Sequence, residues 1–139
     1  MAITREFTIA TRPDLAAVYA RLGASPLERE QKLGQIILDF YSTMAADVML
    51  GFFFADKDLN TTAMRQKQFM MRAMGASTSY PGKAPAQAHT QLPPILRGHF
   101  DRRLIILESV LKRQGLSQED IQSWVGFENT FREGIETKG

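Results

Sequence analysis

The chain contains no cysteine, which excludes disulfide bonds and metal sites built on thiolates. It also lacks a long apolar run: the longest extends only from Val48 to Ala55 and is too short to span a bilayer. The first residues, Met1 to Phe7, lack the apolar core of a secretory signal. We therefore expect a cytoplasmic protein that has no membrane partner.

An excess of charge of one sign is also missing. The 17 basic residues nearly balance the 15 acidic ones, and they are spread along the chain without a dense Lys/Arg block. This pattern predicts no nucleic-acid partner. The 139 residues, 44% of them hydrophobic and 23% charged, are typical of one globular domain. We expect this domain to cover residues 1–139, with residues 1–11 as an N-terminal arm.

Apolar residues recur at helical spacing along most of the chain, and no strand pattern or internal repeat competes with them. The fold class predicted is all-α. The first helices are expected over 14–22 and 26–47, followed by a tight turn within 48–54. The next helix is expected to be capped by Asn60 or Thr61 and to end at Met74, and another to cover 96–113. A last helix should begin with a Ser117–Asp120 capping box and reach Ile135.

An irregular segment from Gly75 to Pro94 separates two of these helices. Proline and glycine leave room in it only for a short helical turn, which holds His89, one of two histidines in the chain. An isolated histidine is usually an ordinary surface or core residue. A neutral imidazole is nevertheless a good iron ligand, and this segment can direct the ring independently of the helices. His99 opens a regular helix, where capping the helix or contacting a propionate is as good an interpretation as a chemical role.

No cluster of Asp, Glu or Cys at metal-binding spacing accompanies either histidine, and no nucleophile motif, phosphate loop or dinucleotide fingerprint is present. A metal bound by His89 would therefore bring its other ligands with it, as iron does in a porphyrin.

Tyr41 and Gln66 are the other polar candidates. Tyr41 shares an apolar stripe with Ile37 and Met44, so its hydroxyl points inward and needs a partner. The ordinary alternatives are a core tyrosine bonded to a backbone carbonyl and, for Gln66, exposure to solvent. Phe53 and Phe54 could simply be core residues.

Taken together, these residues resemble the truncated (two-over-two) haemoglobins, and the match extends from Val18 to Val125. Each motif is weak, but their order and spacing make the combination specific. The motifs are Val18–Gly23, Asp39–Tyr41, the Leu50–Phe54 corner, Arg65–Gln66, Ala73–Gly75, Ser79–Gly82, Ala88–His89 and His99–Asp101.

The resemblance implies a globin-like, two-over-two helical sandwich around haem b (iron protoporphyrin IX). It makes His89 the proximal iron ligand and Tyr41 the donor of a hydrogen bond to bound oxygen. Gln66 would support this tyrosine, and Thr62 would stand at the distal gate. The remaining residues would contact the haem: Phe54, Met70, Tyr80, Ile95 and Phe100 at the ring, and Arg65 at a propionate.

Arg103 departs from the family pattern, because it stands where some groups carry a tryptophan that faces the distal pocket. One interpretation is an arginine that reaches the surface. The other is a charge that contacts a propionate, a bound anion or the distal ligand network. Tyr41 and Gln66 suggest group 1 of the family, whereas the segment from Leu92 to Leu104 has features of group 3.

The function implied is reversible binding of dioxygen, nitric oxide or another diatomic gas. An enzymatic alternative is nitric-oxide dioxygenation or peroxide chemistry at the same iron, which would need an external reductase. A third interpretation, a globin-shaped interaction domain without haem, is opposed by the presence of His89, Phe54 and Tyr41 in one register.

Overall fold

The computed structural model describes residues 10–77 and 94–135, and every regular element within these ranges is helical. The elements are α1 (Pro13–Ala20), α2 (Pro26–Ala46), the 3₁₀ helix η1 (Gly51–Phe54), α3 (Leu59–Ala73), α5 (Arg97–Arg113), α6 (Gln118–Asn129) and the short α7 (Arg132–Ile135). The prediction of an all-α protein is confirmed.

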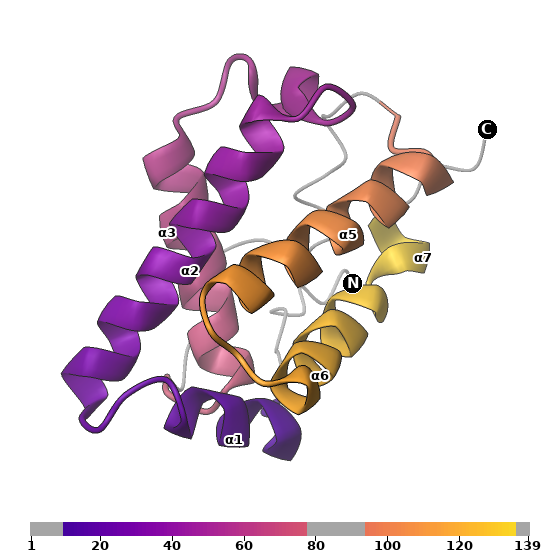
Figure 1. Cartoon of the computed structure of the whole chain (residues 1–139). Helices are drawn as coiled ribbons and strands as arrows, with labels where there is room; N and C mark the ends of the chain where they lie inside the picture. The colour runs from indigo at the N-terminus through magenta and orange to yellow at the C-terminus, as the bar shows by residue number, and fades with distance from the viewer. Residues whose placement is uncertain (1–9, 78–93, 136–139) are drawn as a thin grey trace, which may run out of the picture.

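The four longest helices form two pairs (Figure 1). Helix α2 lies beside α3, and α5 lies beside α6, while α2 and α5 make the main contact between the pairs. Helix α1 crosses their ends and packs against α6. This is the two-over-two arrangement expected from the sequence, and it leaves the inner faces of four helices directed toward one another.

The N-terminus of α2 forms as predicted, because the Ser25 side chain accepts a hydrogen bond from the Glu28 backbone N–H. The predicted cap of α3 was wrong. Asp58, not Asn60 or Thr61, caps this helix by accepting from the Asn60 N–H. Its carboxylate also accepts from the Thr61 hydroxyl at 2.8 Å, so the threonine supports the cap instead of forming it.

Two glycines end helices in the left-handed conformation that side chains disfavour. Gly75 has φ +78° after α3, and Gly115 has φ +88° after α5. In both cases the next residue returns a backbone hydrogen bond to the last turn, from Ala76 to Met71 and from Leu116 to Leu111. Both helices therefore end where their glycines predict.

The last predicted helix is instead two helices, α6 and α7, which break between Asn129 and Arg132. Ser117 does cap α6 by accepting from the Asp120 N–H at 3.2 Å. The Asp120 carboxylate does not complete the capping box, because it pairs with Arg21 beyond the end of α1. This tertiary ion pair holds α6 against the first part of the chain.

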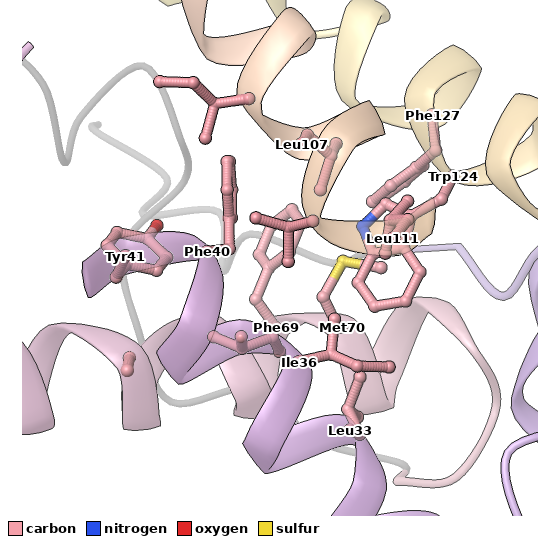
Figure 2. Close-up of a cluster of buried hydrophobic side chains, with 14 of the residues drawn as sticks. Leu33, Ile36, Phe40, Tyr41, Phe69, Met70, Leu107, Leu111, Trp124 and Phe127 are labelled. Carbon is pink, nitrogen blue, oxygen red and sulfur yellow. The ribbon is translucent and has the colours of Figure 1, made fainter. Parts of the chain in front are cut away.

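The apolar stripes of the four helices meet in one buried cluster (Figure 2), to which α1 and η1 add further residues. Its fully buried side chains include Leu33, Ile36, Met70, Leu107, Leu111 and Trp124. Tyr41 lies at one edge of the labelled side chains, so the site described below borders the core.

Residues 1–9 of the predicted arm lie outside the described part of the chain. The next residues dock on α3: the Arg12 N–H donates to the Ala73 carbonyl, and Arg72 donates to the Thr11 hydroxyl. None of the helices in the described ranges combines the length and apolar character needed to cross a membrane.

We expect Leu33→Ala to lower the free energy of unfolding by about 2–5 kcal/mol, because Leu33 is fully buried and its loss leaves a cavity. Leu38→Ala is the matched control on the same helix, since Leu38 is 41% exposed and should change stability by about 0.5 kcal/mol or less. Urea unfolding of the two variants measures both effects. Equal losses would contradict the assignment of Leu33 to the core.

Candidate functional site

The site begins with Tyr41, near the C-terminal end of α2. Its side chain points inward as the apolar stripe predicts, and the residue is 7% exposed. Its ring makes edge-on contacts with Phe54 of η1, at 5.8 Å between centroids, and with Phe40, at 5.5 Å. Two of the predicted site residues, Tyr41 and Phe54, are therefore in contact.

Arg103 of α5 reaches the same place. Its side chain is only 18% exposed, and its guanidinium carbon lies 4.9 Å from the ring centroid of Phe40 and 5.9 Å from that of Tyr41. The interpretation that Arg103 extends to the surface is therefore wrong. The two aromatic rings cover the guanidinium, and a buried carboxylate balances its charge.

That carboxylate belongs to Glu128 of α6. Its Oε2 accepts from Arg103 Nη2 at 3.1 Å and from Nε at 3.3 Å, and the residue is 5% exposed. The other oxygen, Oε1, accepts from Gln66 Nε2 of α3 at 3.2 Å. Each of the four long helices thus contributes one polar side chain to a set that we call the four-helix network: Tyr41, Gln66, Arg103 and Glu128.

The surroundings of Tyr41 shift the pKa of its phenol in opposing directions. Burial raises the pKa of Tyr41 above its ordinary value, and the negative charge of Glu128 acts in the same direction. The positive charge of Arg103 and its hydrogen bond to the phenol oppose this rise. Burial disfavours the charge of Arg103 as well, but Glu128 and Tyr41 outweigh it and raise the pKa of the guanidinium. Tyr41 is therefore a neutral phenol beside a permanent cation.

The direction of the hydrogen bonds decides what Tyr41 can do. A guanidinium has only donors, so the phenol oxygen is the acceptor in its hydrogen bond with Arg103. Within residues 10–77 and 94–135, none of the side-chain hydrogen bonds has the Tyr41 hydroxyl as its donor.

Gln66 occupies a different place in the network from the one implied by the resemblance. It donates to Glu128, and Arg103 is the polar side chain in contact with Tyr41. Thr62 is half-buried, and its hydroxyl donates to the Asp58 carbonyl at 3.1 Å within the first turn of α3. Arg65 is exposed on the same helix, and no carboxylate in the described ranges pairs with it.

The predicted ring contacts do not all lie near Tyr41. Met70 is fully buried among the core side chains, away from Tyr41 (Figure 2). Phe100 is buried beneath the Arg132 guanidinium, 4.7 Å from its ring centroid, and Ile95 is also buried. His89 and Tyr80 lie outside the described residues, so their predicted roles stay predictions.

His99 has the capping role that was one of its alternatives. Its Nδ1 accepts from the Leu96 N–H at 3.0 Å at the start of α5, and its ring makes edge-on contacts with Phe52 and Phe53. The nitrogen is therefore engaged by the backbone of its own helix.

Glu128 is the member of the network that the sequence interpretation missed. A signal was present, because Glu128 lies four residues after Trp124 and seven after Ile121, both of which are buried on α6. A carboxylate at that spacing falls on the buried face and needs a cation as its partner. Only tertiary packing shows that this cation is Arg103.

Comparisons with known proteins agree with this architecture. Residues 17–136 match the family model of bacterial-like globins. A group 1 truncated haemoglobin from Synechocystis is 32% identical over 108 residues, which cover 76% of this chain and 83% of the relative.

Two solved structures have a similar fold. The truncated haemoglobin of Tetrahymena pyriformis in its Fe(III) form superposes with a TM-score of 0.74 at 23% identity, covering 87% of this chain and 98% of that one. The 2/2 haemoglobin of Synechococcus sp. PCC 7002, in the cyanomet state and with covalently attached haem, gives a TM-score of 0.72 at 25% identity and covers 85% and 96% of the two chains.

We expect Arg103→Met to lower the free energy of unfolding by about 3–5 kcal/mol, because it leaves the Glu128 carboxylate buried without its cation. Arg113→Met is the matched control. Arg113 lies on the same helix and pairs with Asp39, but its side chain is 52% exposed, so water screens the pair and the loss should be much smaller. Chemical denaturation measures both, and equal losses would argue against a buried pair.

Proposed function

Because this chain belongs to the bacterial-like globin family as a truncated haemoglobin, we propose that it binds haem b and reversibly binds dioxygen or another diatomic gas. The family implies gas binding at haem, and the four-helix network supports the choice of dioxygen. We also propose membership of group 1, supported by the Synechocystis relative and by the presence of both Tyr41 and Gln66 in the four-helix network. A cytoplasmic location is proposed from the cysteine-free composition.

The chemistry of the residues fits haem. Phe54 and Phe40 present apolar rings beside Tyr41, and the exposed Arg65 is suited to a propionate. His89 is proposed as the axial ligand from its place in the family pattern, with Tyr80, Ile95 and Phe100 as ring contacts. The bound group supplies an iron atom that coordinates small diatomic gases.

One observation carries the choice of dioxygen. The Tyr41 phenol is buried and its oxygen accepts from Arg103, so the phenol can use its own proton as a donor to a bound ligand. Dioxygen held at the iron would carry partial negative charge, so a buried donor would stabilise it more strongly than it would stabilise a less polar gas. A hydrogen bond to a charged acceptor contributes about 1.5–3 kcal/mol, or roughly ten- to a hundredfold in affinity.

An enzymatic role, nitric-oxide dioxygenation or peroxide chemistry with an external reductase, is the second candidate. The buried Arg103 charge favours it, because a fixed cation stabilises anionic species in a pocket that excludes water. Consumption of nitric oxide by the oxygenated protein, supplied with a reductant, would distinguish turnover from simple gas storage.

Titration of the purified protein with haemin should give a saturable Soret band. We expect His89→Ala to weaken or shift this band, since it removes the proposed axial ligand. His99→Ala is the control, because the His99 ring already caps α5. A protein that gives no Soret band with haemin would contradict the proposed function altogether.

Tyr41→Phe should speed dioxygen dissociation by about ten- to a hundredfold, because it removes the proposed phenol donor and keeps the ring. Tyr19→Phe is the control, as Tyr19 lies on α1 and outside the four-helix network. Stopped-flow displacement of dioxygen by carbon monoxide measures the rate. If both variants dissociate dioxygen at the wild-type rate, another group must be the donor.

A further inference from the structure

Arg103 gives the site a property that binding a neutral gas does not require. Taking a guanidinium and a carboxylate out of water is costly, and an apolar pair of similar size often serves stability equally well. A hydrogen bond from Tyr41 would suffice for dioxygen. Dioxygen binding therefore does not explain why the charges of Arg103 and Glu128 are buried here.

We propose that Arg103 makes the ligand pocket favour small inorganic anions over neutral ligands, and that Glu128 limits this preference because it is the internal counterion that competes with an incoming anion. The inference rests on the proposed function, because the anion would occupy the gas-binding position beside Tyr41. The ligands it concerns are small linear anions such as azide.

The donors of Arg103 are only partly committed. Nε and Nη2 both point to one oxygen of Glu128, Oε2. Nη1 lies 3.7 Å from the Met44 sulfur, which is a weak acceptor. A guanidinium carries five N–H donors, and another of them bonds the Tyr41 phenol. Among the described residues, one donor is therefore left for an additional acceptor next to that phenol.

Glu128 keeps a second hydrogen-bond partner when Arg103 also binds an anion. Its second oxygen, Oε1, keeps the hydrogen bond from Gln66 at 3.2 Å. The carboxylate therefore need not be left without a partner when the guanidinium turns partly toward a ligand. Gln66 would act here as a positioning residue for the counterion.

No other charged group of the described ranges acts on the Tyr41 phenol besides Arg103 and Glu128. The neighbouring arginines of α5 have carboxylates elsewhere: Arg102 pairs with Asp47 and Arg113 with Asp39. The charge that an anion meets beside Tyr41 is thus set by one cation and one carboxylate. Removing Arg103 should therefore lower the affinity for an anion, and removing the charge of Glu128 should raise it.

The test compares azide binding to the ferric haem-loaded protein with carbon monoxide binding to the ferrous form, both followed at the Soret band. Arg103→Met should lower the ratio of azide to carbon monoxide affinity by about tenfold or more. Glu128→Gln keeps the size of the side chain and removes the competing charge, so it should raise the same ratio by a similar factor. Arg113→Met and Asp39→Asn, which alter the more exposed ion pair between α5 and α2, should leave it unchanged.

The apoprotein gives a second readout that does not involve ligand binding. Glu128→Gln should lower the pKa of the Tyr41 phenol and Arg103→Met should raise it, since their charges act on it in those senses. Ultraviolet difference titration of phenolate, with Tyr41→Phe as the blank, follows this group. A Tyr41 titration unmoved by either variant would overturn the inference.

The outcomes also separate this inference from the proposed function. A wild-type protein that forms no Soret band would remove both. A normal Soret band with an azide ratio unchanged in both variants would overturn the anion selectivity alone. A ratio shifted in the same direction by both variants would also overturn it, because a general disturbance of the pocket predicts that result.

Discussion

A buried cation needs a partner, and the rest of the site depends on how this chain supplies one to Arg103. The guanidinium enters from α5 and is covered by the rings of Phe40 and Tyr41. Glu128 reaches it from α6, and Gln66 holds that carboxylate from α3. An isolated charge at this place would be strongly destabilising. The four helices must therefore pack in one register for the network to be complete.

This requirement joins the two helix pairs through polar bonds as well as apolar contacts. The core cluster holds the helices together but does not by itself specify which helix faces meet, since apolar burial depends on area and tolerates repacking. The hydrogen bonds from Gln66 and Arg103 to Glu128 specify which faces of α3, α5 and α6 meet. We infer that the network contributes more to the geometry of the pocket than to the net stability of the fold.

The helices themselves were largely predictable, because their apolar stripes and terminal glycines are local signals. Ser25 and Gly115 mark helix ends through interactions within a few residues. Asp120 shows the limit of local reasoning, since its carboxylate bonds Arg21 instead of completing a capping box. The break between α6 and α7 was missed for a similar reason: periodicity of apolar residues continues across a short interruption.

The site was predictable in part. The inward direction of Tyr41 follows from its stripe, whereas its role as a donor to a ligand is a proposal that rests on the family pattern. The position of Arg103 did not, because a long side chain near an apolar row can either reach water or turn inward. The choice depends on Glu128, which lies on another helix 25 residues later. Sequence spacing alone cannot show that these two side chains meet.

The order of groups in the network has a chemical consequence. If the Tyr41 phenol faced the Glu128 carboxylate directly, its proton would be donated to that carboxylate and would not be available to a ligand. Arg103 contacts both and can only donate, so the phenol accepts from Arg103 and its proton is not directed to Glu128. The same cation offsets part of the rise in the phenol pKa caused by burial, which makes Tyr41 a stronger donor than burial alone would allow. The departure at Arg103 is therefore compatible with the donor role proposed for Tyr41.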